Sequence, residues 1–161
     1  YPAVIEMKRK AVGTYVLFVL IALAVGGLAS WLTNQGMPAY EALRKPPFTP
    51  PAAVFPVVWT VLYVLMGLSA ARVWRTEDPA RGRAIGLWAL QLALNFLWTL
   101  WSFTLGWYLL AFLWLIGLVV VVALMVRAFL RIDRAAGWMQ VPYLAWCCFA
   151  TVLSGGVWWL N

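Results

Sequence analysis

The side chains that could do chemistry within this chain are amides, hydroxyls and indoles, because it has no histidine and only five acidic residues. We expect all the acids to fall in tails or loops: Glu6, Glu41, Glu77, Asp78 and Asp133. This inventory excludes a zinc site, a Ser-His-Asp triad and a histidine-ligated haem. It also removes the usual groups of proton-coupled pumps. We therefore predict no catalytic residue, no metal site and no obligatory cofactor.

Polar side chains recur at helical spacing in one apolar stretch. They follow i, i+4, i+7, i+8 and i+11: Gln91, Asn95, Trp98, Thr99 and Ser102. An unpaired amide in hydrocarbon is costly, so Gln91 and Asn95 should point inward, toward protein partners or a ligand. Hydrogen bonding between helices is the alternative to a ligand site.

Ten of the twelve tryptophans divide by their expected depth in a membrane. One group lies near the ends of apolar runs, where indoles anchor at the headgroup level: Trp31, Trp74, Trp107, Trp138, Trp158 and Trp159. A second group lies deeper: Trp59, Trp98, Trp101 and Trp146. Trp59 and Trp146 share helix faces with Tyr63 and Tyr143 respectively, and their flat rings would suit a large planar apolar ligand. Core packing is the alternative for these rings.

The elements that position these residues are apolar runs. The chain is 65% hydrophobic and 11% charged, too apolar for a soluble domain. Each run has the roughly 20 residues that cross about 30 Å of hydrocarbon as a helix: 11–32, 54–74, 84–104, 105–128 and 138–160. The runs lack the alternation of a β-barrel strand. We predict an all-α integral membrane protein, a five-transmembrane-helix bundle that forms one domain over residues 1–161.

Two boundaries need interpretation. We divide the third and fourth runs near Gly106, the flexible point in a long apolar stretch. Residues 1–6 differ in character from the rest of the chain, and Met7-Lys8-Arg9-Lys10 would make a natural start. We interpret 1–6 as an added remnant without function.

The net charge of +7 reflects topology rather than nucleic-acid binding, because the basic residues are spread over loops. Three clusters would share one side of the bundle: Lys8 to Lys10, Arg72 to Arg83, and Arg127 to Arg134. The other side holds Arg44 and Lys45. The positive-inside rule therefore predicts a cytoplasmic N-terminus.

The loop after the first run is rich in proline. Lys45-Pro46-Pro47-Phe48-Thr49-Pro50-Pro51 cannot be helical, because proline restricts itself and the residue before it. We predict a stiff collar, which is the name used below for residues 45–51. Ala22, Gly26 and Ser30 form a small-residue ridge on the first run, suited to close helix packing.

Several segments resemble a known family. The collar is followed by Phe55-Pro56, Val58-Trp59-Thr60, Leu62-Tyr63 and Leu65-Met66-Gly67. Gln91-Leu92-Ala93-Leu94-Asn95-Phe96-Leu97-Trp98 and Val141-Pro142-Tyr143-Leu144-Ala145-Trp146, with Phe149-Ala150, come later in the same order. Together they resemble the translocator protein family (TspO/MBR), also called tryptophan-rich sensory proteins or peripheral benzodiazepine receptors.

The resemblance implies a five-helix bundle, commonly a homodimer, with a pocket beneath the first loop. That pocket binds porphyrins such as protoporphyrin IX or haem, sterols, and benzodiazepine-type ligands in the family. The implied ligand-binding positions are Trp59, Asn95 and Trp146, with Tyr63, Trp98, Tyr143 and Ala150 as neighbours. The function expected by resemblance is a porphyrin receptor or carrier with a sensory or transport role in tetrapyrrole homeostasis and stress.

Alternatives stay open at this point. Family members have been proposed to degrade porphyrin photochemically, which would make the chain an enzyme, and a ligand-controlled sensory scaffold is a third hypothesis. A homodimer could form through Gly82/Gly86 and Ala89/Ala93, although these pairs could equally pack within one protomer. We expect a bacterial cytoplasmic membrane, with a bacterial or mitochondrial outer membrane as the alternative.

The chain also departs from the family pattern. Ala39 and Phe48 stand where many members have tryptophan, Ser154 replaces an asparagine, and Leu100 replaces a proline. The cholesterol-recognition stretch of animal members would fall near 153–161, where glycines and Trp159 replace its key residues. Sterol binding is therefore the less favoured interpretation.

Overall fold

The computed structural model describes residues 2–33, 38, 41–51 and 53–161. In this part of the chain, five helices are long and apolar enough to cross a membrane. They are α1 (Pro2–Thr33), α3 (Val54–Arg75), α4 (Arg81–Thr99) with its π-helical extension η2 (Leu100–Thr104), α5 (Tyr108–Ile132) and α6 (Arg134–Leu160). The predicted all-α fold with five spanning helices is confirmed.

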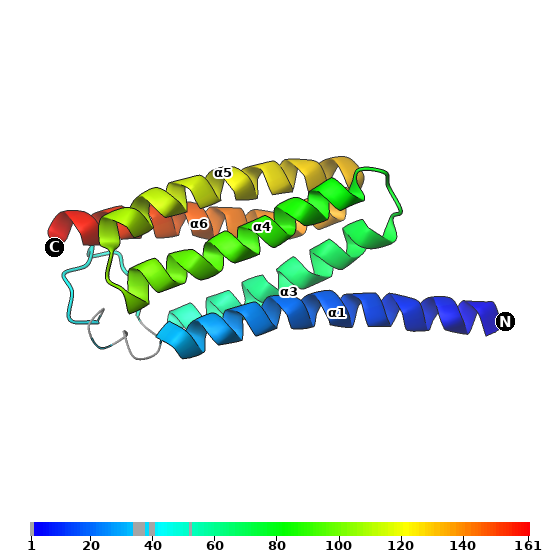
Figure 1. Cartoon of the computed structure of the whole chain (residues 1–161), viewed down its shortest axis with the longest axis horizontal. Coiled ribbons are helices and arrows are strands. Elements are labelled where there is room, and N and C mark those ends of the chain that lie inside the picture. The colour runs from blue at the N-terminus through cyan, green and yellow to red at the C-terminus, as the bar shows by residue number, and fades with distance from the viewer. Residues whose placement is uncertain (1, 34–37, 39–40, 52) are drawn as a thin grey trace.

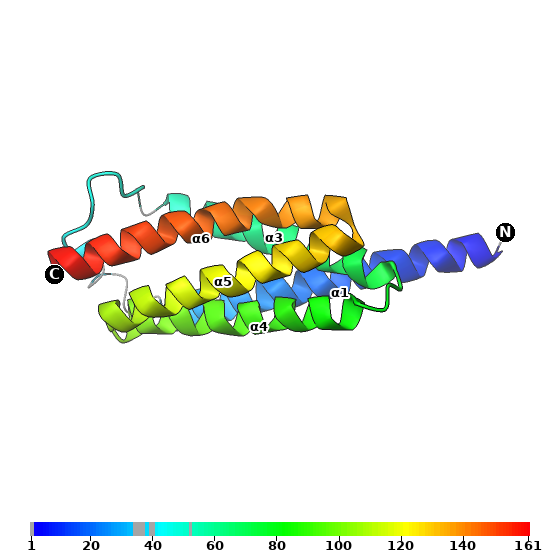
Figure 2. The ribbon, with the colours of Figure 1, turned by 90° about the horizontal axis from the view of Figure 1, so that it is seen from above.

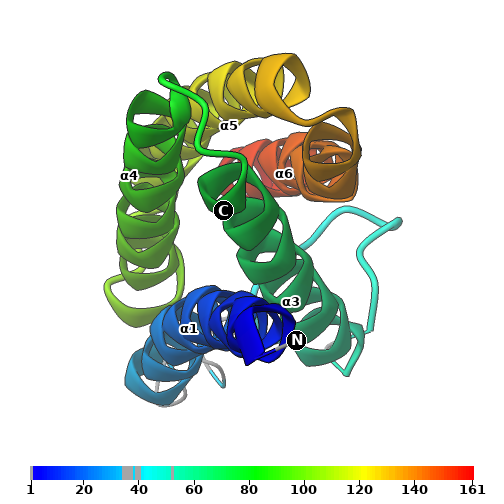
Figure 3. The ribbon, with the colours of Figure 1, turned by 90° about the vertical axis from the view of Figure 1, so that its right-hand side faces the viewer.

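The helices run side by side as an elongated bundle (Figures 1 and 2). Viewed from the end, α1 lies on one flank beside α3 and α4, and α5 and α6 form the opposite side (Figure 3). Helix α3 packs against α1, α4 and α6. Residues carried by α3 can therefore reach three neighbouring helices, which makes it the natural support for an internal site.

Helix α1 is longer than the expected run. It begins at Pro2 rather than at residue 11, and its first turns extend past the other helices (Figure 1). Residues 2–6, interpreted above as a remnant, are part of this continuous helix. The helix ends at Thr33, one residue beyond the expected end of the first run at residue 32.

The division between the third and fourth spans lies at Gly106, as predicted. Gly106 has φ +66°, a left-handed conformation that suits glycine. However, α5 begins at Tyr108 and ends at Ile132, so the expected span 105–128 lies three to four residues too early. The reason is the π-helical segment Leu100–Thr104, which ends α4, followed by a turn in which Trp107 N–H donates to the Trp101 carbonyl (2.8 Å).

Helix α6 begins at Arg134, four residues before the expected start. Asp133 is its N-cap and accepts a hydrogen bond from the Ala135 backbone N–H (3.2 Å). Asp133 also pairs with Arg72 at the end of α3, with 2.8 Å between Oδ2 and Nε. One carboxylate therefore starts α6 and ties it to α3. The early start leaves Pro142 well inside α6, which continues through it.

The charge pattern agrees with the arrangement of the helices. The N-terminal end, the α3–α4 connection and the α5–α6 turn share one end of the bundle, so the three basic clusters lie together (Figure 1). The six tryptophans expected to act as anchors are all exposed and near helix ends. Arg81 lies 3.9 Å from the ring centroid of Trp74, a cation–π contact at this basic end.

Close packing of α1 on α3 depends on glycine. A Cβ at Gly67 would collide with the backbone of Val19, and a Cβ at Gly26 would collide with the ring of Tyr63. Ala22, on the same ridge of α1 as Gly26, is fully buried. The predicted small-residue ridge is therefore a contact between α1 and α3, although its last member, Ser30, is exposed.

The collar is non-helical, as predicted, and lies against α6. Pro46 is buried and fills the space beside Gly156, where a Cβ would collide with it. Phe48 contacts Phe149, with 6.2 Å between ring centroids. The departure noted at Ala39 lies outside the described residues.

We predict that Gly67→Ala destabilises the bundle by about 1–3 kcal/mol, because the added methyl group overpacks the contact with the Val19 backbone. Gly117→Ala is the matched control, since Gly117 faces open space on α5. Alanine raises helix propensity in both variants, by about 1 kcal/mol. Thermal unfolding in detergent measures the difference, and equal stability of the two variants would contradict the packing described for α1 and α3.

Candidate functional site

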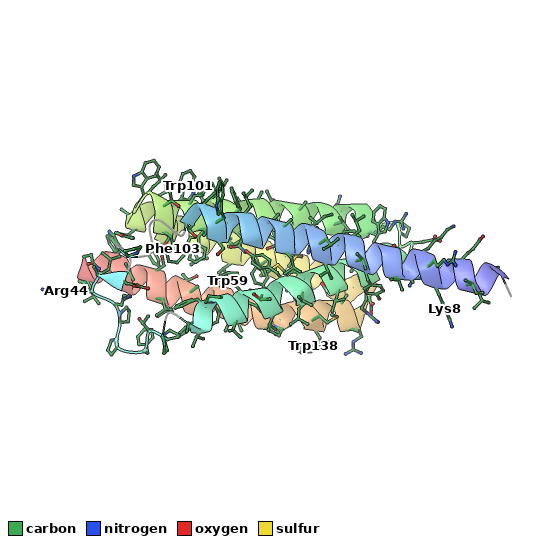
Figure 4. All side chains as sticks on the ribbon, turned by 90° about the horizontal axis from the view of Figure 1, so that it is seen from below. Lys8, Arg44, Trp59, Trp101, Phe103 and Trp138 are labelled. Carbon is green, nitrogen blue, oxygen red and sulfur yellow. The ribbon has the colours of Figure 1, made fainter. Side chains whose placement is uncertain are left out.

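Trp59 lies at the centre of an aromatic cluster. It points from α3 into the bundle (Figure 4), and the structure brings four other rings around it. The ring centroids lie at 5.7 Å from Tyr63, 6.1 Å from Trp98, 6.3 Å from Tyr143 and 6.3 Å from Trp146. Five of the seven predicted site residues therefore form one contiguous group, contributed by α3, α4 and α6.

A cavity of about 690 Å³ opens on one side of this cluster. Its wall comes from α1, the loop before α3, α3 itself and the end of α4. Trp59, Tyr63 and Trp98 line it, joined by Phe55 and Phe103. A cavity of this size, with aromatic walls, is typical of sites for small organic ligands.

The lining residues that the structure describes do not include the other four predicted site residues, Asn95, Tyr143, Trp146 and Ala150. Tyr143 and Trp146 lie on the α6 side of Trp59. Ala150 borders a separate small cavity of about 20 Å³, which Phe55, Trp98 and Phe103 also line. These three rings form a partition between the two spaces.

The two amides predicted to face inward are fully buried. Gln91 Oε1 accepts a hydrogen bond from the Tyr143 hydroxyl (2.6 Å), and Asn95 Nδ2 donates to the Tyr63 hydroxyl oxygen (3.3 Å). Both bonds join α4 to a neighbouring helix. The alternative of hydrogen bonding between helices thus holds for Gln91, and it accounts for one side of the Asn95 amide.

Some buried polar atoms around Trp59 have no hydrogen-bond partner within the described part of the chain. They are Asn95 Oδ1, Trp98 Nε1 and Trp146 Nε1. Trp98 is 6% exposed and lines the cavity, but its indole nitrogen is itself buried and lies behind the cavity surface. Buried polar atoms without a partner are uncommon in proteins.

The loop that precedes α3 lines one end of the cavity. Glu41, Lys45, Thr49 and Pro50 line this end. The loop is held by Asn161, whose Oδ1 accepts from the Arg44 N–H (3.3 Å) and whose Nδ2 donates to the Arg44 carbonyl (2.8 Å). The predicted collar thus covers a real cavity.

Comparison with known proteins agrees with this arrangement. The family model described as TspO/MBR matches residues 18–160. The chain belongs to the TspO/MBR family. Its relatives include the protein CrtK of Rhodobacter capsulatus, 36% identical over 148 residues, which cover 88% of this chain and 89% of that protein.

Two further TspO/MBR relatives are a bacterial and a human protein. The tryptophan-rich sensory protein of Cereibacter sphaeroides is 41% identical over 115 residues, covering 71% of this chain and 72% of that protein. The human translocator protein is 34% identical over 131 residues, which cover 78% of this chain and 76% of that protein. Family membership and the five apolar helices together make the chain an integral membrane protein.

In this TspO/MBR protein, two positions noted above as departures from the expected pattern lie at distinctive structural features. Leu100 begins the π-helical segment, whose wider turn changes the direction of the side chains after it. Phe103 lines the cavity, a position that regular helical spacing did not predict. Gly156, in the stretch that lacks the sterol motif, leaves room for Pro46 of the collar.

Sequence reasoning also missed two tryptophans with structural roles. Trp88 Nε1 donates to the Met66 carbonyl (3.2 Å), and Trp114 Nε1 donates to the Leu94 carbonyl (2.9 Å). A signal for Trp88 was present, because it precedes Gln91 by three residues and so extends the inward stripe of α4. These bonds fix α4 against α3 and α5.

We predict that Tyr143→Phe costs about 1–3 kcal/mol of stability, because it leaves Gln91 Oε1 buried without its donor. Thermal unfolding in detergent measures this loss. The double variant Tyr143→Phe, Gln91→Leu should recover most of it, since no unpaired oxygen then remains at this position. Strictly additive losses in the double variant would contradict the pairing of these two side chains.

Proposed function

We propose that this protein is a membrane receptor or carrier for porphyrins, such as protoporphyrin IX or haem, and for related hydrophobic molecules. The observation that carries the proposal is the 690 Å³ cavity walled by Trp59, Tyr63 and Trp98. Its volume lies within the range of about 300–1,000 Å³ that is usual for ligand sites. Flat indole faces suit a large planar ring system.

The seven predicted residues have different parts in this proposal. Trp59, Tyr63 and Trp98 contact the ligand from the cavity wall. Asn95, Tyr143 and Trp146 support Trp59 and Tyr63 from behind through the contacts described above. Ala150 lies across the partition, in a space that ligand could enter if the rings of Phe55 and Phe103 turn aside.

The proposed setting is a bacterial cytoplasmic membrane with the N-terminus in the cytoplasm. Its support is the gathering of the basic clusters at the end that holds the N-terminus. The collar and the cavity then lie toward the external side. Relatives named tryptophan-rich sensory protein and translocator protein favour a role in sensing or transport of the ligand.

A homodimer formed through α4 is the proposed assembly. Gly82, Gly86, Ala89 and Ala93 share one face of α4 and are all exposed, so they do not pack within the protomer. Small residues at this spacing let two helices approach closely in a membrane.

We predict that Gly86→Leu reduces the dimer obtained by cross-linking in nanodiscs, because the larger side chain separates the two helices. Ala123→Leu, at an exposed position of α5, is the matched control and should leave the dimer unchanged. Equal cross-linking of both variants would show that α4 is not the interface.

The ligand proposal predicts that Trp59→Ala weakens protoporphyrin IX binding about 5- to 150-fold, because the cavity loses its main aromatic wall. About 1–3 kcal/mol is expected for one stacked ring, which corresponds to this range. Porphyrin fluorescence in nanodiscs measures the affinity. Trp138→Ala is the control, since Trp138 is exposed at the opposite end of the bundle (Figure 4).

Equal affinity of the Trp59 and Trp138 variants would rule out this cavity as the porphyrin site. The same titration under illumination separates the receptor from the photochemical enzyme. If the protein is a receptor, illumination leaves the absorbance spectrum of the bound porphyrin unchanged. A new bilin-like absorbance that tryptophan-to-phenylalanine substitutions abolish would instead indicate an enzyme.

A further inference from the structure

We propose that Lys45 binds a carboxylate on the edge of the ligand and thereby orients it, with its acidic edge at the collar and its apolar body against Trp59. This inference rests on the proposed function, because it concerns how a ligand lies in the same cavity. It assigns the cavity a ligand class, namely a planar apolar molecule that carries a carboxylate at one edge.

The charge distribution of the cavity wall points to the collar end. The charged residues among those described in the lining are Glu41 and Lys45, both in the loop before α3. The remainder of the wall is aromatic, aliphatic or hydroxyl-bearing. An ionised carboxylate placed among Trp59, Tyr63 and Trp98 would lose its hydration without a counter-charge, which is costly. A ligand with one acidic edge therefore gains most by placing that edge near Lys45.

The threonines in the wall do not compete for this role, because their hydroxyl protons are already used. Each donates to a nearby backbone carbonyl: Thr33 to Ser30 (3.2 Å), Thr49 to Pro46 (2.7 Å), Thr60 to Pro56 (2.7 Å) and Thr99 to Asn95 (3.0 Å). They present methyl groups and acceptor lone pairs to a ligand. An anionic group needs donors, and the ammonium group of Lys45 supplies them with a positive charge.

Contacts made by Lys45 itself and by the residues before and after it fix its position. One of its interactions is a hydrogen bond from Nζ to the Glu41 backbone carbonyl (3.3 Å), and an ammonium group has three N–H bonds to share among several oxygen acceptors. On one side the Arg44 backbone is bonded to Asn161, and on the other Pro46 is packed beside Gly156. Lys45 is half-buried, so a pair with a carboxylate is screened less than at an open surface.

Glu41 shares this end of the cavity but is exposed. Its carboxylate repels an anionic ligand, and water screens that repulsion. Removing this charge should therefore favour the acidic ligand, in the direction opposite to removing the charge of Lys45. The two residues give variants with opposite expected signs at one site.

The test compares protoporphyrin IX with its dimethyl ester, which keeps the ring system but has no ionised carboxylate. Affinities are measured by porphyrin fluorescence with the full chain in nanodiscs, after subtraction of partitioning into empty nanodiscs. Lys45→Ala should weaken binding of the acid about tenfold, the scale of a hydrogen bond between charged groups, and leave the ester unchanged. Lys45→Arg should restore the affinity for the acid, and Glu41→Gln should increase it.

Arg44→Ala is the matched control, because Arg44 is an adjacent exposed cation that does not line the cavity (Figure 4). It should change neither affinity. Equal loss of acid and ester in Lys45→Ala would mean that Lys45 only supports the loop, and would overturn the inference, as would an unchanged acid affinity. If the wild type binds neither compound, the proposed function itself fails, whereas equal wild-type binding of acid and ester defeats this inference alone.

Discussion

The pairing of the buried amides of α4 is the constraint on which the rest of the structure depends. In hydrocarbon, Gln91 and Asn95 have no water to bond, so α4 must turn them toward partners on other helices. The hydroxyls of Tyr143 on α6 and Tyr63 on α3 supply those partners. Once this face of α4 is turned inward, Trp98, one turn further on, necessarily faces the interior beside Trp59.

The cavity arises because the helices are close in one part of the bundle and apart in another. Glycines let α1 approach α3 closely at Gly67 and Gly26. Beyond Gly26, the collar and the end of α4 form part of the cavity wall. The collar can cover this space because Gly156 admits Pro46 and Asn161 holds the Arg44 backbone. A polar, charged mouth thus lies above an aromatic interior, an arrangement suited to ligands with one polar edge.

Much of the bundle could be predicted from periodicity and composition. The five apolar runs, the inward stripe of α4 and the non-helical collar result from hydrophobicity, spacing and proline chemistry. Helix ends were less accurate, because they depend on single interactions such as the cap that Asp133 gives to α6. The π-helical segment was not predicted, since it changes the helical period locally and so brings Phe103 to the cavity.

By itself the sequence determined that the chain crosses a membrane as helices, which face of α4 turns inward and which tryptophans lie exposed near helix ends. Each of these depends on the energy of placing one side chain in lipid or in water, and needs no knowledge of neighbours. Only the tertiary structure decided that Trp59 and Trp98 border the cavity while Trp146 and Asn95 stand behind them. That division depends on distances between helices, which the close contacts at glycines and the hydrogen bonds of the tyrosines set together.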